Sequence, residues 1–230
     1  MKTYPKENIP GVIMPRRSFL RHAGVGAVSA GLLATAACHK GNQIMVRPNK
    51  IDIGKGDLSI LNYAYALEQI EAAFYTQLIQ TPYTDITTDE RALFTTIRDQ
   101  EILHREFFKA ALGLNAIPDL VFDFSTIDFT TRSNVLFAAK SFEDIGVLAY
   151  VGSGHYVQNK DYLTITAKIT SVEARHAALL SNMIVPGTFN AGDQVDGNGL
   201  NKFLGIPDVL YLVNSYLKTK VAAVYYDYQV

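Results

Sequence analysis

The sequence has little cysteine, no excess of one charge and no long uninterrupted apolar run. Cys38 is the single cysteine, so an internal disulfide is excluded. The formal net charge is −1 and no basic run occurs beyond the N-terminal region, which argues against nucleic acid as a partner. No stretch approaches the ~20 apolar residues that a membrane-spanning helix needs. Of the 230 residues, 48% are hydrophobic and 19% are charged, so we expect one main folded domain with a sizeable core.

The N-terminal region has the pattern of an export signal. Residues 15–21, Pro-Arg-Arg-Ser-Phe-Leu-Arg, precede a Gly/Ala-rich apolar segment over 23–37 that is too short to span a membrane comfortably. This pattern resembles a twin-arginine signal in which Pro15 and Arg21 replace the usual Ser or Thr and the frequent Lys. We therefore predict that residues 1–38 are a twin-arginine-type signal. The protein is then exported to the periplasm or anchored in the cell envelope.

Two ways of processing this segment are left open. Residues 35–38, Thr-Ala-Ala-Cys, resemble a lipoprotein cleavage box with Thr in place of the usual Leu, which would attach lipid to Cys38. The alternative is cleavage by an ordinary signal peptidase at residues 34–36, Ala-Thr-Ala. In either case we expect contact with the membrane only through the signal or a lipid anchor. Residues 39–57 are polar and lack periodicity, so they are predicted to form a linker.

Helical periodicity dominates the rest of the chain. Apolar residues recur at i, i+3 and i+4 spacing in four segments that are bounded by cap residues, glycine and proline. The expected helices cover 58–80, 89–112, 131–153 and 161–184. Residues 113–130 contain Pro118 and an extended-looking alternation, and they are too many for a tight turn, so we expect a crossover. A Gly/Asn/Asp-rich loop follows over 187–205, and then a fifth helix from Pro207 to Thr219 and an aromatic tail that docks on the bundle.

One motif occurs twice within the expected bundle. Glu101-Ile-Leu-His104 returns 72 residues later as Glu173-Ala-Arg-His176. Residues i and i+3 of a helix lie on one face, so each Glu and His form a ready pair of metal ligands. This repeat is the main functional signal in the sequence.

The helices that precede these motifs also match each other. When the first expected helix is laid on the third, Glu68 matches Glu143 and Tyr75 matches Tyr150. Each half of the bundle then contains a Glu, a Tyr and a Glu-x-x-His motif in the same order. We interpret the bundle as a two-helix unit that is used twice.

Four glutamates that face one another inside a bundle require a counter-charge. Burying even one unpaired carboxylate costs several kcal/mol. Two divalent cations would balance four carboxylates, and bridging carboxylates with one imidazole per ion suit iron or manganese better than tetrahedral zinc. Taken singly, each Glu could face solvent and each His could be a hydrogen-bonded core residue. Taken together, their order and symmetry predict a site for two divalent ions, iron or manganese.

Residues 58–185 resemble the ferritin-like superfamily, and within it the exported bacterial and plant desiccation-related branch. Together with the helical pattern, the resemblance implies an all-α fold, a four-helix bundle over 58–185 with a long crossover between helices 2 and 3. Residues 186–230 are expected to form a loop, an additional C-terminal helix and a tail that pack on the bundle. The metal ligands that the resemblance implies are Glu68, Glu101, His104, Glu143, Glu173 and His176.

Three further residues are candidates for the surroundings of the metals. Glu71 lies one turn from Glu68, so it is an alternative ligand on the first helix or a partner of the ligands. Tyr75 and Tyr150 follow the paired glutamates by seven residues, which returns them to nearly the same helix face. They are candidates for a second layer around the metals, or core residues whose hydroxyl is satisfied elsewhere.

We expect an exported dimetal-carboxylate protein that reacts with oxygen or peroxide, because two adjacent redox metals can share the electrons of O–O cleavage. A role in defence against oxidative stress would suit a protein of the cell envelope. Ferrous oxidation, peroxide reduction and manganese-catalase-type disproportionation share these ligands, so the sequence neither separates them nor decides whether the protein is an enzyme. The alternative is a non-catalytic metal-binding or structural protein that protects the envelope during stress such as drying. No rubredoxin-like cysteine pairs are present, so an on-board electron-transfer domain is not expected. The oligomeric state is left open, with a homo-oligomer among the alternatives.

Overall fold

The computed structural model describes residues 46–47, 50–189 and 193–230; the predicted signal over 1–38, including Cys38, lies outside them. In chain order the elements are β1 (Val46–Arg47), β2 (Lys50–Asp52), α2 (Asp57–Gln80), α3 (Thr88–Leu112), η1 (Gly113–Asn115), α4 (Arg132–Ser153), η2 (Gly154–Tyr156), α5 (Lys160–Ile184), α6 (Ile206–Val213), η3 (Asn214–Tyr216), β3 (Lys220–Ala222) and η4 (Val224–Tyr226). Within this described part, no helix is both long and apolar enough to cross a membrane.

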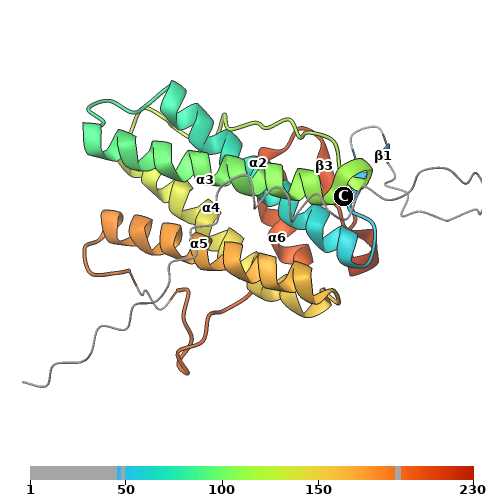
Figure 1. The fold of residues 1–230 in the computed structure, drawn as a ribbon. Coiled ribbons are helices and arrows are strands. Elements are labelled where there is room, and N and C mark those ends of the chain that lie inside the picture. Colours follow the sequence, from blue (N-terminus) through green and yellow to red (C-terminus); the bar gives the residue numbers. More distant parts are fainter. Residues whose placement is uncertain (1–45, 48–49, 190–192) are drawn as a thin grey trace, which may run out of the picture. The chain divides into compact units, whose positions relative to one another are not determined.

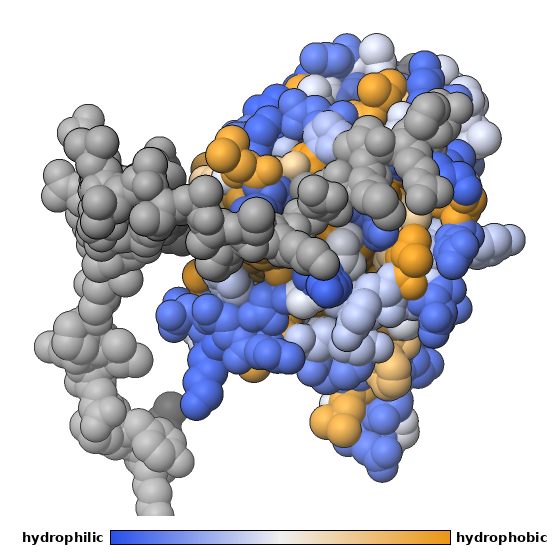
Figure 2. Space-filling model, turned by 90° about the vertical axis from the view of Figure 1, so that its right-hand side faces the viewer, coloured by the Kyte–Doolittle hydropathy of each residue, from blue (hydrophilic) through white to orange (hydrophobic). Residues whose placement is uncertain are grey.

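Four long helices, α2 to α5, lie along one another and form the bundle, and α6 packs against α4 (Figure 1). This confirms the predicted all-α fold class, including the long crossover and the additional C-terminal helix. A small three-stranded sheet in the order β1-β2-β3 is added to the bundle. Where described residues are visible in Figure 2, hydrophobic side chains form small patches between hydrophilic ones.

α2 is the central helix of the bundle. Every residue from Ser59 to Ala72 is buried, because α3, α4 and the crossover cover different sides of the helix. Two polar side chains of α2 satisfy backbone groups of the crossover: the backbone N–H of Ile117 donates to Asn62 Oδ1 at 2.8 Å, and that of Leu120 donates to Gln69 Oε1 at 2.7 Å. A buried helix keeps polar residues where they have such partners. These bonds hold the crossover along α2.

Crossed hydrogen bonds show that α2 and α4 run antiparallel. Tyr75 of α2 donates to Glu143, near the middle of α4, while Tyr150, one to two turns further along α4, donates to Glu68. α2 with α3 and α4 with α5 are the two most extensively packed helix pairs, and each pair is joined by a short connection. α3 and α4 therefore run in the same direction, so the crossover between them has to return along the length of the bundle.

Local capping explains where two of the helices begin. Thr87 and Glu90 form a capping box at the start of α3, in which Thr87 Oγ1 accepts from the backbone N–H of Glu90 at 3.1 Å. The side chain of Asn159 caps α5 by accepting from two backbone N–H groups of its first turn. Asp57, at the start of α2, accepts from the backbone N–H of Asn159 at 2.8 Å, which ties the beginnings of α2 and α5 together.

The structure differs from the linker predicted over 39–57. β2 pairs in parallel with β3, with Ile51 beside Val221, and Ile51 and Ile53 are almost completely buried. Residues 50–53 are therefore part of the folded core. The short strand could not be recognised from its local pattern, because its partner strand lies at the other end of the chain.

The fifth helix is shorter than predicted. α6 ends at Val213 instead of continuing to Thr219, and the chain turns through η3 into β3. The turn is held by Asn214, whose side chain accepts from the backbone N–H of Val221 and donates to the carbonyl of the same residue, both at 2.8 Å. Beyond it, the hydroxyl of Tyr226 lies 2.8 Å from Ser59 Oγ of α2. The helix ends before Asn214 because the side chain of Asn214 forms hydrogen bonds with the backbone of Val221 that a continued helix would not allow.

Candidate metal centre

Six side chains from the four bundle helices converge in the interior. They form two groups of four whose ligand atoms lie within 4.8 Å of one another. The first group is Glu68, Glu101, His104 and Glu173, and the second is Glu101, Glu143, Glu173 and His176. The two groups share Glu101 and Glu173. The structure thus brings together all six residues predicted as ligands.

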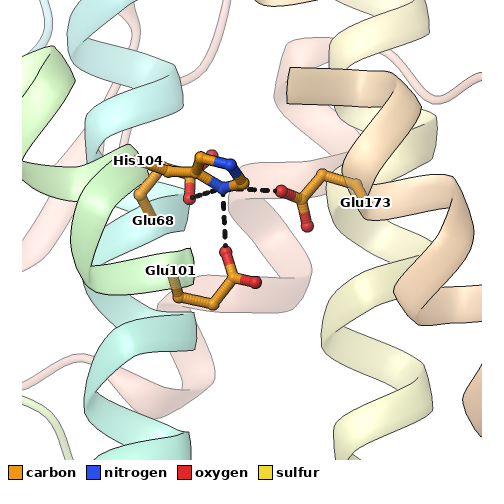
Figure 3. Close-up of side chains that lie close together, drawn as sticks. All are labelled: Glu68, Glu101, His104 and Glu173. Atoms are coloured by element: carbon orange, nitrogen blue, oxygen red, sulfur yellow. Dashed lines mark hydrogen bonds and ion pairs between the residues drawn. The ribbon is translucent and has the colours of Figure 1, made fainter. Parts of the chain in front are cut away.

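His104 faces three carboxylates through one ring nitrogen (Figure 3). Its Nδ1 lies 2.9 Å from Oε1 of Glu173, 3.2 Å from Oε2 of Glu101 and 3.4 Å from Oε2 of Glu68. A ring nitrogen carries at most one hydrogen, so it cannot donate to all three oxygens at once. Three oxygens and one nitrogen that are aimed at one place are instead a donor set for a divalent cation.

His176 repeats this arrangement in the other half of the bundle. Its Nδ1 lies 2.9 Å from Oε1 of Glu101, 3.3 Å from Oε2 of Glu143 and 3.8 Å from Oε2 of Glu173. Glu143 thus takes the place that Glu68 has beside His104. The matched order of residues in the two halves appears here as matched geometry.

The cluster leaves buried oxygens without a hydrogen-bond partner. All four glutamates are 0% exposed. The unpartnered atoms are Oε2 of Glu68, Oε1 of Glu101, Oε2 of Glu143 and both carboxylate oxygens of Glu173. These are the same oxygens that face the two histidines, and a buried acceptor without a partner is costly. The residues present therefore fit two divalent cations, which would bind all of these oxygens.

Without a cation, burial and the neighbouring charged groups shift the pKa values of the residues in the cluster. Burial, followed by the charge of Glu173, raises the pKa of Glu68 to about 8. Burial opposes a charge on His176, but its hydrogen bonds to the surrounding carboxylates outweigh burial and raise its pKa to about 12. Two imidazolium groups supply two positive charges for four carboxylates, so the remaining carboxylates are pushed toward their neutral form. Two divalent cations would supply four positive charges and remove this imbalance.

A family model described as ferritin-like domain matches residues 56–186, more than half of the chain. The chain belongs to the ferritin-like family. This confirms the predicted superfamily, and the match covers α2 to α5 with all six residues of the cluster. A comparison with curated proteins finds no match.

In this ferritin-like bundle, two tyrosines hold the carboxylates that are not shared between the groups. The hydroxyl of Tyr75 donates to Oε1 of Glu143 at 2.6 Å, and the hydroxyl of Tyr150 donates to Oε1 of Glu68. In each glutamate the other oxygen, Oε2, then faces a histidine. Both tyrosines lie next to the predicted ligands, and each is bonded to the glutamate of the opposite half.

Glu71 belongs to neither group of four. It is 1% exposed, and its Oε1 would lie only 2.8 Å from a Cβ atom placed on Gly146. Burial, and then the charge of Glu173, raise its pKa well above the usual value. The structure therefore brings Glu68 into the ligand cluster and leaves Glu71 one turn away, in the space opened by the glycine that matches it in the repeat.

One residue of the site was missed from the sequence. Oε1 of Gln100 lies 2.7 Å from Nε2 of His176, the ring nitrogen that points away from the carboxylates. Gln100 directly precedes Glu101, and at 100° per residue it lies on another helix face than the ligands of its own helix. Its partner is 76 residues away, so no local spacing marks it.

Proposed function

We propose that this ferritin-like protein binds two divalent ions, iron or manganese, and reacts with oxygen or peroxide. The observation that carries the proposal is the pair of four-residue groups that share Glu101 and Glu173. Glu101 and Glu173 would be shared by the two ions, and one imidazole and one further carboxylate would complete the residues that hold each ion. Two adjacent redox-active ions, when bound, can share the electrons needed to cleave an O–O bond.

The protein's own residues would position the ligands and exclude bulk water. Tyr75 and Tyr150 each hold one oxygen of an unshared carboxylate, which directs its other oxygen into the cluster. Each tyrosine ring stacks on a phenylalanine of α3, Tyr75 on Phe94 and Tyr150 on Phe108, with 6.4 Å between ring centroids in both pairs. These aromatic pairs are buried and give the charged cluster an apolar surrounding. Electrostatic interactions with bound ions are stronger in such surroundings.

We infer further that the protein acts after export, in defence against oxidative stress in the cell envelope. The support for export is the twin-arginine pattern of residues 15–21 and the small-residue segment that leads to Cys38. The alternative function is non-catalytic metal binding that protects the envelope during stress such as drying. The two functions differ in whether the protein with bound ions catalyses a reaction of oxygen or peroxide.

Metal binding and turnover test the proposal directly. Metal analysis of the protein from its native envelope, and anaerobic titration of the metal-free protein with ferrous or manganous ion, should give two ions per chain. The loaded protein should then consume oxygen or peroxide. Glu173→Gln alters a carboxylate shared by both groups and should weaken both positions. Glu106→Gln is the matched control, because Glu106 lies on α3 with a half-exposed side chain and outside both groups.

The possible outcomes distinguish three interpretations of the cluster. Two bound ions with turnover support the proposal. Two bound ions that react with neither oxygen nor peroxide would favour the non-catalytic function. A wild-type protein that binds neither ion would overturn the metal centre itself, and the Glu-x-x-His motifs would then be ion pairs of the core.

A further inference from the structure

The two histidines of the cluster differ in what their second ring nitrogen contacts. Nε2 of His176 lies 2.7 Å from Oε1 of Gln100, whereas Nδ1 of the same ring faces the carboxylates. An amide oxygen only accepts hydrogen bonds, so the hydrogen of this contact is on Nε2. The lone pair of the neutral ring is then on Nδ1, where a metal ligand requires it. Gln100 of α3 thus orients a ring carried by α5.

The other half of the bundle has no such contact. Among the described residues, none accepts a hydrogen bond from Nε2 of His104. The position that corresponds to Gln100, directly before the second Glu-x-x-His motif, is Val172, whose side chain accepts no hydrogen bond. The side chain of His104 is also more exposed, 14% against 8% for His176. The two halves therefore match in their predicted ligands but differ in the residue that directly precedes each Glu-x-x-His motif.

We propose that Gln100 is a positioning residue that fixes the ring of His176, and that this contact makes the two metal positions unequal. The inference rests on the proposed dimetal function. The position with His176 and Glu143 is pre-organised, because Gln100 fixes the orientation of the imidazole and keeps a hydrogen on Nε2, so that an arriving ion has only to replace the hydrogen on Nδ1. At the position with His104 and Glu68, the ring is held only by the carboxylates that the ion itself would bind, because no described residue accepts from its second nitrogen. The first ion therefore binds beside His176, and the ion beside His104 exchanges more readily.

Cobalt(II) is a suitable probe, because it takes nitrogen and oxygen ligands and its unpaired electrons shift the proton signals of bound imidazoles. The full-length metal-free protein is titrated with cobalt(II), and the exchange of the shifted imidazole N–H protons with solvent is followed by NMR. The wild type should bind two ions with different affinities. One imidazole N–H, that of His176, should exchange slowly because it is hydrogen-bonded, and the other should exchange fast.

Gln100→Leu removes the acceptor while leaving every ligand in place. It should weaken the tighter of the two positions by roughly 10–100-fold, the usual effect of losing a hydrogen bond to a ligand histidine. It should also turn the slow N–H exchange into fast exchange. Gln100→Glu keeps an acceptor oxygen at the same reach and should restore the slow exchange. Gln80→Leu is the matched control, since Gln80 is an exposed residue at the end of α2, and it should change neither result.

If Gln100→Leu does not fold, Gln100→Met serves in its place, because its side chain is similar in length to glutamine and accepts only weakly. Unchanged affinities and unchanged slow exchange in the folded variant would overturn the role of Gln100. So would two equal affinities in the wild type. A wild type that binds no cobalt(II) would instead overturn the proposed dimetal function, so the two failures are distinguishable.

Discussion

The carboxylate of Glu143 should stabilise the protein only when metal is bound. Burial, and then the charge of Glu101, raise its pKa well above the usual value, so the metal-free protein favours the neutral form. Glu143→Gln imitates this neutral form, and the metal-free variant should be at least as stable as the wild type. A metal at a hundredfold excess over its Kd stabilises a folded protein by about 2.7 kcal/mol. The variant should lose most of this gain.

Thermal melts of both proteins, with chelator and with ferrous or manganous ion, measure this difference. The exposed Glu106→Gln variant should respond to metal like the wild type. A Glu143→Gln protein that loses the same stability with and without metal would show that Glu143 is an ordinary structural residue of the core.

Tyr75 should be sensitive to the loss of its hydroxyl, whereas Tyr63 should not. Tyr75→Phe removes the hydrogen bond to the buried Glu143, and losing a partner of a buried acceptor costs about 1–3 kcal/mol. Tyr63 is just as buried, but its hydroxyl has no hydrogen-bond partner among the described residues. Tyr63→Phe should therefore be neutral or stabilising. Urea unfolding of the two metal-free variants checks the contrast, and equal losses would count against the role of Tyr75.

The start of α3 should make the stability of the bundle depend on pH. Burial raises the pKa of Glu90, but hydrogen bonds from Arg132 and from the backbone of the capping box outweigh burial, so the pKa lies below its usual value. Because the pKa of Glu90 is lower in the folded than in the unfolded protein, the ionised Glu90 stabilises the folded state. This stabilisation is complete above the unfolded pKa of about 4.3. It is lost as the pH falls through the folded pKa. Urea midpoints of wild type and Glu90→Gln should therefore differ at pH 7 and converge toward pH 3.

The contact between α4 and the segment before α6 depends on a glycine. A Cβ atom on Gly152 would lie 1.9 Å from the carbonyl oxygen of Leu204, and the backbone N–H of Leu204 donates to Leu148 at 3.2 Å. Gly152→Ala therefore has to displace backbone, and overpacking of this kind costs typically about 1–3 kcal/mol. Gly154→Ala is the control, because its Cβ would meet only Leu163 at 4.0 Å. Similar unfolding free energies for the two variants would contradict the close packing.

At the scale of the whole molecule, export should depend on the paired arginines. Replacing Arg16 and Arg17 by lysine keeps the charge but removes the paired guanidinium groups of the proposed signal. The precursor should then accumulate in the cytoplasm, which cell fractionation measures. A normal amount of the double variant in the envelope would rule out a twin-arginine signal. Mature protein that begins after Cys38 would separately rule out lipid on that cysteine.

Local patterns in the sequence determined the elements and the type of site. Helices α2 to α5 follow from apolar spacing and cap residues, and their observed bounds lie within one residue of the predicted ones. The Glu-x-x-His motifs were visible because a ligand pair at i and i+3 is a property of one helix turn. The repeated order of Glu, Tyr and Glu-x-x-His indicated a shared site for the two halves. These features depend on neighbours along the chain, so they could be read without the fold.

Contacts between distant segments were decided only by the tertiary structure. The pairing of Ile51 with Val221, the choice of Glu68 over Glu71 for the cluster, and the hydrogen bond from His176 to Gln100 each join residues of different elements. A helix pattern gives the face on which a residue lies, but the rotation of each helix against its neighbours is set by how the whole core packs. Among the residues that the structure describes, the same packing gives Nε2 of His176 an acceptor and gives none to Nε2 of His104, although the two motifs look alike in the sequence.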